Sequence, residues 1–374
     1  MKFPKEKIII TLIVLVLLFL LTSIVVFSSN AEPSVSARAA VLYEPITKTF
    51  LFSKNADERM PFASTTKIMT ALVAIENFPI DSEVEVVPEA CGIEGSSLYL
   101  KPGEVLSMRE LLVSLMLRSA NDAAAAIAYA VAGGIEEFAD MMNERALQLG
   151  LKDTHFTNPH GLDNELHYTT ARELALIAAK AMENETFREI CSLKKDRVIN
   201  SDDEARLVVN HNKLLKLYDG AIGIKTGFTK KSGRCLVGAA ERDGLTLITV
   251  TLDAPDDWSD HARLFDRGFS LMEARTLAQI GEFSYTLPIL DSDTEAIGVS
   301  NAEGFSIITR KDDSDVTADV NLPRYVIAPV EKGQELGKVT FYKDGELLGE
   351  IPLIAEDKAQ KTDKGGFFRH FKNR

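Results

Sequence analysis

The sequence predicts an α/β domain with an antiparallel sheet, followed by a small all-β domain. Strand-like segments at about residues 37–52 and 221–252 enclose a helix-rich middle. After about residue 274 the pattern changes to short β-like runs separated by polar turns. Because a helical block flanked by strands packs on a sheet formed by both ends of that segment, we place the first domain at residues 37–272 and the second at 277–355.

The first domain opens with a hairpin and a helix. Residues 39–43 and 47–52 are strand-like and are separated by a turn that contains proline, which is typical of paired strands. In residues 64–77 apolar side chains recur at helical spacing, and no glycine or proline interrupts them. We therefore expect a hairpin and then a helix that begins at Ser64.

The rest of the first domain alternates between helices and strands. Residues 107–149 are rich in alanine and leucine and predict helices with one break, at Gly133 and Gly134. A further helix is expected at residues 170–182. β-Branched runs predict strands at residues 221–225, 234–241 and 245–252. Asp243 and Gly244 stand between the last two strands, and this dipeptide favours a tight hairpin turn.

The second domain is followed by a C-terminal segment of different composition. Residues 277–355 include the strand-like runs 338–342 and 346–354, with an Asp-Gly turn signal between them. Residues 356–374 are polar, then basic and aromatic. Their basic residues are Lys358, Lys361, Lys364, Arg369, Lys372 and Arg374, and their aromatic residues are Phe367, Phe368 and Phe371. This composition fits attachment to a membrane surface of anionic lipid, and a solvated tail remains the alternative.

The N-terminus has the composition of an export signal. Three lysines within residues 1–7 precede an uncharged, mostly apolar run at residues 8–27. Ser29 and Ala31 follow, with the small side chains that a signal peptidase requires. The run is also long enough to span a bilayer. Residues 1–31 are therefore a signal peptide cleaved after Ala31 or an uncleaved N-terminal membrane anchor. In both cases the rest of the chain is exported.

Charge and cysteine content exclude several classes of function. The formal net charge of −13 speaks against nucleic acid as a partner, because binding to phosphates needs a basic surface. Cys91, Cys191 and Cys235 are too few for a disulfide framework. They stand at no metal-ligand spacing, and no zinc-peptidase motif occurs. We expect neither a metal nor another cofactor.

Three short motifs follow one another in the first domain. They are Ser-Thr-Thr-Lys at residues 64–67, Ser-Ala-Asn at 119–121 and Lys-Thr-Gly at 225–227. Each alone is weak, since Ser-x-x-Lys recurs at 192–195 and Ser-x-Asn at 28–30. The setting separates them, because Ser64 opens an apolar helix and the Lys-Thr-Gly motif lies on a predicted strand. In this order they are typical of serine penicillin-binding proteins and class A β-lactamases.

The first two motifs would supply a nucleophile and its base. Residues three apart share one helix face, which places Lys67 beside Ser64. A serine hydroxyl needs a neighbouring base, and a buried lysine can lose its charge and serve as one. Ser119 and Asn121 would complete the hydrogen bonds around Lys67 and the substrate amide.

The third motif would bind the substrate. Lys225 offers a cation and Thr226 a hydroxyl to a terminal carboxylate. Gly227 would leave the strand face clear for substrate. The backbone N–H groups of Ser64 and Phe228 would form the oxyanion hole, because the first N–H groups of a helix are free to bind negative charge.

The chain resembles the D-alanyl-D-alanine carboxypeptidases of the low-molecular-weight penicillin-binding proteins over about residues 37–356. The segments at residues 63–72, 119–124, 156–162 and 223–229 carry the resemblance. It implies a β-lactamase/transpeptidase-like catalytic domain, an acyl-enzyme on Ser64, and a β-domain that lifts this domain off the membrane. The implied partners are peptidoglycan stem peptides ending in D-Ala-D-Ala and β-lactams that acylate the same serine.

Two features depart from the family or compete with its mechanism. Members often carry arginine near the substrate carboxylate, whereas the comparable stretches here, residues 210–212 and 254–258, contain none. A second carboxylate-binding cation therefore has no candidate in the sequence. His160 and His167 suggest a Ser-His-Asp triad, but His160 lies in an Asn-Pro-His-Gly turn. We expect it to make structural hydrogen bonds, since Lys67 already fills the role of base.

Three other functions stay open. A D,D-endopeptidase would cut peptidoglycan cross-links with the same residues. A β-lactamase would need a carboxylate that activates water, and no Glu-x-x-Leu-Asn segment occurs between the second and third motifs. A binding protein with a degraded site is disfavoured by the intact motifs.

Overall fold

The computed structural model describes residues 32–362. The chain divides into two compact units, with the main boundary between Gly268 and Phe269 and with residues 243–245 grouped with the second unit. The leader at residues 1–31 and the basic aromatic end at 363–374 lie outside the described residues. Within residues 32–362 no helix is both long and apolar enough to cross a membrane.

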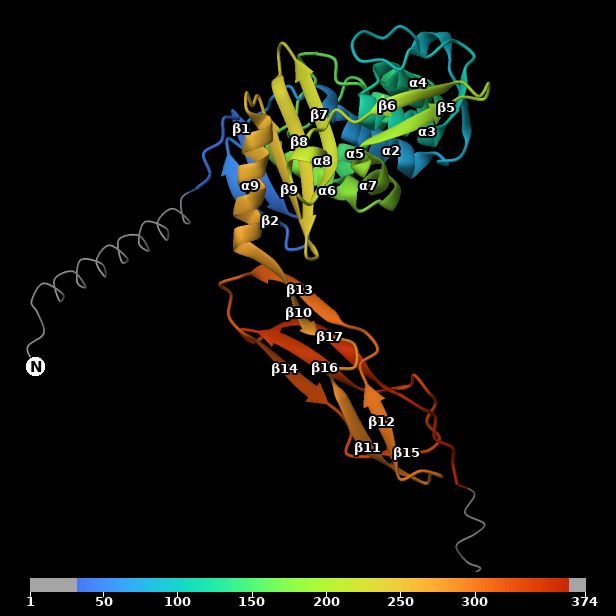
Figure 1. The fold of residues 1–374 in the computed structure, drawn as a ribbon, viewed down its shortest axis with the longest axis vertical. Helices are drawn as coiled ribbons and strands as arrows, with labels where there is room; N and C mark the ends of the chain where they lie inside the picture. Colours follow the sequence, from blue (N-terminus) through green and yellow to red (C-terminus); the bar gives the residue numbers. More distant parts are fainter. Residues whose placement is uncertain (1–31, 363–374) are drawn as a thin grey trace, which may run out of the picture. The chain divides into compact units, whose positions relative to one another are not determined.

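The first unit contains a five-stranded sheet (Figure 1). In spatial order its strands are β2 (Thr49–Lys54), β1 (Ala39–Glu44), β9 (Leu245–Leu252), β8 (Gly233–Arg242) and β7 (Ala221–Thr229). The registers of β1 with β2, of β1 with β9 and of β7 with β8 are antiparallel. Asp243 and Gly244 join β8 to β9 with φ of 49° and 82°, as a tight hairpin turn requires. The predicted antiparallel sheet from both ends of the domain is confirmed, and β7 forms one edge.

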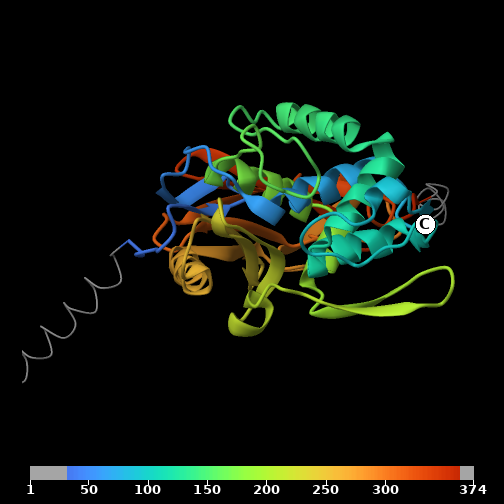
Figure 2. The same cartoon turned by 90° about the horizontal axis from the view of Figure 1, so that it is seen from above.

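Helices fill the space between the outer strands in the sequence. They are α2 (Lys67–Asn77), α3 (Met108–Val113), α4 (Asn121–Ala132), α5 (Ile135–Gln148), α6 (Ala171–Met182), α7 (Glu185–Ser192), α8 (Leu214–Leu217) and α9 (Asp257–Leu271). α9 packs on one sheet face, where His261 bonds Thr249 at 2.6 Å and Thr251 at 3.0 Å. α4, α5, α6 and α7 pack against α2 and form the larger helical cluster (Figure 2), whereas α8 lies against β7.

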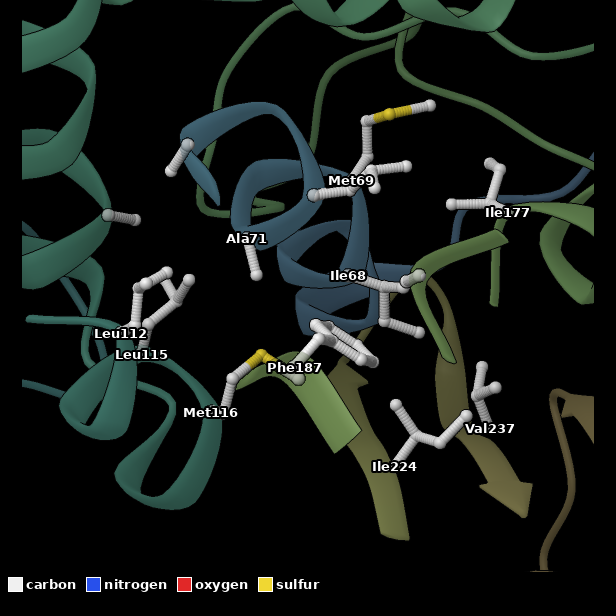
Figure 3. Close-up of a cluster of buried hydrophobic side chains, with 14 of the residues drawn as sticks. Ile68, Met69, Ala71, Leu112, Leu115, Met116, Ile177, Phe187, Ile224 and Val237 are labelled. Carbon is white, nitrogen blue, oxygen red and sulfur yellow. The ribbon is translucent and has the colours of Figure 1, made fainter. Parts of the chain in front are cut away.

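α2 is buried along most of its length, which fixes the residues at its start. Figure 3 shows Ile68, Met69 and Ala71 among side chains from several elements. These neighbours are Leu112 of α3, Met116 just after α3, Ile177 of α6, Phe187 of α7, Ile224 of β7 and Val237 of β8. A helix packed on all sides cannot shift without opening this core.

The predicted helical block at residues 107–149 has a second break that the sequence did not indicate. A π-helical turn, Ser114–Arg118, follows α3, and Ser119 then has a left-handed backbone with φ of 65°. The expectation of one break, at Gly133 and Gly134, was therefore wrong. The N–H of Asn121 donates instead to Ser96 O at 2.7 Å, so a tertiary contact to a distant loop replaces the helical bond.

Several elements fall in stretches without a prediction. They are β3 (Glu83–Glu85), β4 (Val105–Ser107), β5 (Lys195–Ile199), β6 (Ala205–Val209), α7, α8 and α9. β5 and β6 pair as a hairpin (Figure 2) that lies against α3, where Ile199 N donates to the Glu110 carboxylate at 2.8 Å.

The second unit is all-β, as predicted. One sheet has the order β14 (Val316–Asn321), β16 (Glu335–Lys343), β17 (Glu346–Ala355), β12 (Ala296–Ser300), β11 (Ser284–Leu290) and β15 (Val326–Ile327). β10 (Met272–Ala278) pairs separately with β13 (Phe305–Arg310). Val299, Val339, Phe341 and Leu353 lie in its own apolar core.

Candidate active site

A cleft of about 630 Å³ lies beside the edge strand β7. Its lining includes Ser64, Ser119, Thr226, Gly227 and Phe228. The remaining predicted site residues, Lys67, Asn121 and Lys225, are buried, with exposed fractions of 0%, 4% and 1%. Residues from three distant parts of the sequence therefore meet at one cleft, with hydroxyl and backbone groups at its surface and two amines in its wall.

The nucleophile stands on a tight turn that leads into α2. Residues Ala63–Thr66 form a 3-10 turn, and the α-helix begins only at Lys67. The helix predicted from Ser64 thus starts one turn later than expected. Ala63 has φ of 47°, a left-handed conformation that non-glycine residues rarely adopt.

Lys67 lies at the centre of a polar cluster. Its Nζ is 3.0 Å from Ser64 Oγ and 2.7 Å from Asn121 Oδ1, and it also bonds His160 O. Burial places the pKa of Lys67 well below its usual range, and the charge of Lys225 lowers it further, while Asp122 acts in the opposite direction. The surroundings of Lys67 therefore favour its neutral form.

In the second motif, Asn121 and Ser119 differ in whether they bond Lys67 or face the cleft. Asn121 bonds Lys67 through its side-chain oxygen, and its amide nitrogen donates to Glu94 O. Ser119 lines the cleft, and among residues 32–362 its hydroxyl has no hydrogen-bond partner. The hydroxyl is therefore available to a bound substrate, whereas the predicted bond to Lys67 comes from Asn121 alone.

The third motif lies on β7, as predicted. Burial lowers the pKa of Lys225 to about 7, and its Nζ donates to Thr226 O at 3.0 Å. A Cβ on Gly227 would stand 3.0 Å from Ser64 N and 3.1 Å from Phe62 O. Glycine at this position therefore lets the strand approach the nucleophile turn, which is a different reason from the expected clearance for substrate.

Three cationic residues that line the cleft were not predicted from the sequence: Arg234, Lys213 and Lys216. Arg234 Nη2 bonds both carboxylate oxygens of Asp257, at 2.7 and 2.9 Å, and the guanidinium lies over the Trp258 ring. Its buried Nε has no hydrogen-bond partner in the described part of the chain. Arg234 pairs with Phe228, the residue after the Lys-Thr-Gly motif, in the β7–β8 hairpin. Its place at the cleft could have been predicted only from the register of that hairpin.

The two histidines are placed behind the site. His160 contributes its backbone oxygen to Lys67, and its ring accepts a bond from Leu162 N at 3.3 Å. His167 bonds Thr66 and Thr157. Burial lowers the pKa of each ring to about 3, so both are neutral near pH 7, and neither bonds the Ser64 hydroxyl.

Comparison with known proteins gives the same answer as the motifs. The family model described as D-alanyl-D-alanine carboxypeptidase matches residues 26–256. The chain belongs to this family. A second model, described as the C-terminal domain of penicillin-binding protein 5, matches residues 273–361. The chain is therefore a serine D-alanyl-D-alanine carboxypeptidase and a penicillin-binding protein that processes peptidoglycan stem peptides outside the cytoplasm.

Individual relatives cover most of the chain. The D-alanyl-D-alanine carboxypeptidase DacF of Bacillus subtilis is 33% identical over 89% of this chain and 88% of its own length. DacC of Escherichia coli is 31% identical over 94% and 90%. The structure of penicillin-binding protein 5 from Haemophilus influenzae matches with a TM-score of 0.63 and 27% identity, over 88% of this chain and 99% of that one. The predicted family and two-part fold are thereby confirmed.

Proposed function

We propose that Ser64 is the acylated nucleophile and that neutral Lys67 is its general base. The observation that carries this proposal is the hydrogen bonding of Lys67. A neutral amine has two hydrogens and one lone pair. Asn121 Oδ1 and His160 O accept the two hydrogens, which leaves the lone pair for the Ser64 hydroxyl 3.0 Å away.

The reaction then has two balanced halves. Ser64 Oγ attacks the carbonyl carbon of the penultimate D-alanine, and Lys67 takes the hydroxyl proton. The N–H groups of Ser64 and Phe228 stabilise the oxyanion. Collapse breaks the peptide C–N bond, and the proton from Lys67 passes to the departing amine. Water then hydrolyses the ester, which frees Ser64 and leaves the shortened stem peptide.

We assign the terminal carboxylate to Lys225, Thr226 and Arg234. Thr226 and Arg234 line the same cleft as Ser64, and the Lys225 ammonium lies in its wall. Arg234 is held by Asp257 and still has an unpaired buried Nε. A bound carboxylate would supply an acceptor for such a donor. This set supplies the second cation that residues 210–212 and 254–258 lack.

The function is tested by release of D-alanine from a pentapeptide ending in D-Ala-D-Ala. Ser64→Ala should abolish release. The matched control is Ser192→Ala, which removes the serine of the other Ser-x-x-Lys sequence. Ser192 lies at the end of α7, exposed, with its hydroxyl on Glu189 O at 2.7 Å. Undiminished release by Ser64→Ala, or loss in Ser192→Ala, would contradict the proposal.

We further propose that residues 1–31 direct export and that the basic aromatic tail attaches the protein to the membrane surface. Both proposals rest on composition: an apolar run after three lysines, and three phenylalanines among basic residues. Basic residues each contribute about 1 kcal/mol against an anionic leaflet, which is enough for reversible binding.

A further inference from the structure

The His167 ring is buried behind the nucleophile turn and takes no part in the proposed chemistry. Its exposed fraction is 4%. It stacks on Phe62 with centroids 4.8 Å apart and planes at 12°, and it meets the edge of Phe156 at 5.8 Å. Aromatic packing alone would suit phenylalanine as well as histidine, so the two ring nitrogens need an explanation.

The hydrogen bonds of His167 fix its tautomer. The backbone N–H of Thr157 donates to Nδ1 at 3.0 Å, so Nδ1 carries no proton. The proton of the neutral ring is therefore on Nε2, which donates to Thr66 Oγ1 at 2.8 Å. Since this bond occupies the oxygen as acceptor, the Thr66 hydroxyl proton points to its other partner, Ala63 O, at 2.7 Å. Burial lowers the pKa of His167 to about 3, so the ring is neutral and the relay stays intact at neutral pH.

The end of this relay is the peptide group that carries the Ser64 N–H. A peptide is planar, and its C=O and N–H point in opposite directions. The direction of Ala63 C=O therefore sets the direction of Ser64 N–H. Gly161 closes in on the carbonyl, because a Cβ there would lie 2.0 Å from Ala63 O. At the other end of the peptide, Ser64 N lies against Gly227 of β7, on the side of the cleft.

We propose that His167 is a positioning residue for the oxyanion hole, acting through Thr66 on the Ala63–Ser64 peptide. The Nε2–H of His167 orients the Thr66 hydroxyl, and that hydroxyl holds Ala63 in its left-handed conformation with the Ser64 N–H toward the cleft. The inference rests on the proposed acylation of Ser64 and adds a group that touches neither substrate nor nucleophile.

The test compares two buried threonines of the same helical segment. Thr66→Val removes the relay, whereas Thr70→Val removes a similar bond, from Thr70 Oγ1 to Pro159 O at 2.6 Å, that does not reach the turn. Penicillin acylation is separated into initial binding and the acylation step. Thr66→Val should slow the acylation step about 10- to 100-fold, part of the loss seen when an oxyanion donor is removed, with initial binding unchanged. Thr70→Val should lower the melting temperature and leave acylation within about twofold.

Substitutions of the histidine separate positioning from packing. His167→Phe keeps the stacked ring and should match Thr66→Val, with no further loss in the double variant. His167→Gln offers a side-chain N–H in place of Nε2–H and should recover most of the rate. A peptide boronic acid, whose tetrahedral adduct occupies the oxyanion hole, should lose affinity for Thr66→Val and keep it for Thr70→Val.

The inference fails if folded His167→Phe and Thr66→Val acylate at the wild-type rate. Nitrogen NMR of the unmodified protein gives an independent test that needs no variant to fold. It should show His167 protonated at Nε2 only, and a proton on Nδ1 would overturn the relay. The wild-type acylation trace in the same experiment tests the proposed function separately, because it depends on Ser64 and not on Thr66.

Discussion

Lys67 acquires its proposed role from where the fold places it. Its side chain has no exposed area, and the ammonium form pays for desolvation without a carboxylate bonded to it. Asp122 acts on it only at longer range, since that carboxylate bonds Ser97 and the N–H of Leu98 and Leu100. Burial without a bonded carboxylate lowers the pKa of Lys67. A lysine that would be a cation at the protein surface can therefore act as a base here.

Replacing Lys67 by arginine should separate charge from basicity. Arginine does not lose its proton at working pH, so Lys67→Arg should acylate about 100-fold or more slowly with penicillin, the size of a lost proton-transfer group. Lys54→Arg is the control, because Lys54 Nζ also donates to a backbone carbonyl, Val35 O at 3.0 Å, away from the cleft. Rapid acylation by Lys67→Arg would remove Lys67 from the role of base.

The pKa of Lys225 predicts how activity depends on pH. Because burial lowers this pKa to about 7, Lys225 is charged below pH 7 and loses its charge above it. A substrate with a free terminal carboxylate should therefore show kcat/KM that falls on the alkaline side, with the pKa of the free enzyme. A substrate with a terminal amide should lack this alkaline limb. The same limb in both substrates would mean that another group titrates.

At the scale of elements, contact between β7 and the nucleophile turn defines the site. Gly227 of the Lys-Thr-Gly motif lies close to the turn, with Ser64 N, Thr65 N and Phe62 O within 3.1 Å of an added Cβ. The distance between β7 and the turn at residues 63–66 therefore sets the position of Ser64 relative to the edge strand.

Gly227→Ala should push the strand and the turn apart. Contacts of 3.0–3.1 Å with backbone atoms leave no flexible side chain to yield, so we expect D-alanine release to fall at least about 10-fold by misplacement of the reacting groups. Gly150→Asn serves as the control, since Gly150 has φ of 76° and nothing within 4 Å of an added Cβ, and asparagine tolerates this conformation. Full activity in folded Gly227→Ala would show that the contact does not position the site.

Local patterns explain which elements the sequence could predict. The hairpin of β8 and β9 carries its turn dipeptide, Asp243 and Gly244, and α6 carries its cap, Thr170, whose hydroxyl accepts from Glu173 N. The break at Ser119 has no such signal, because Ser96, far away in the sequence, takes the N–H of Asn121. Arg234 likewise became visible only through pairing with Phe228. Motif order therefore gives the chemistry, and tertiary contacts supply the geometry and the extra cations.

At the scale of the molecule, the two units have separate cores and separate family matches. The first unit holds every residue proposed for catalysis, and the match to the carboxypeptidase family lies within residues 26–256. The second unit has its own apolar core and matches the C-terminal domain of penicillin-binding protein 5. Under the proposals above, export and membrane attachment depend on the two ends of the chain, residues 1–31 and 363–374.

Deleting the tail should affect membrane binding and not catalysis. Protein that starts at Glu32 should bind anionic liposomes, should bind them less at high salt, and should not bind neutral ones. Removal of residues 364–374 takes away three phenylalanines and four basic residues (Lys364, Arg369, Lys372 and Arg374) and should abolish this binding with turnover of soluble pentapeptide unaltered. Equal binding by the truncated protein would show that the tail is only a solvated end.

The acyl-enzyme on Ser64 is tested most directly by peptide mapping after reaction with penicillin. Mass spectrometry of the protein that starts at Glu32 should show one added penicilloyl group, on the tryptic peptide that contains Ser64. Ser64→Ala should carry no adduct, and Ser192→Ala should carry the same adduct as the wild type. An adduct on Ser192, or an undiminished adduct in Ser64→Ala, would contradict the assignment of Ser64 as the nucleophile.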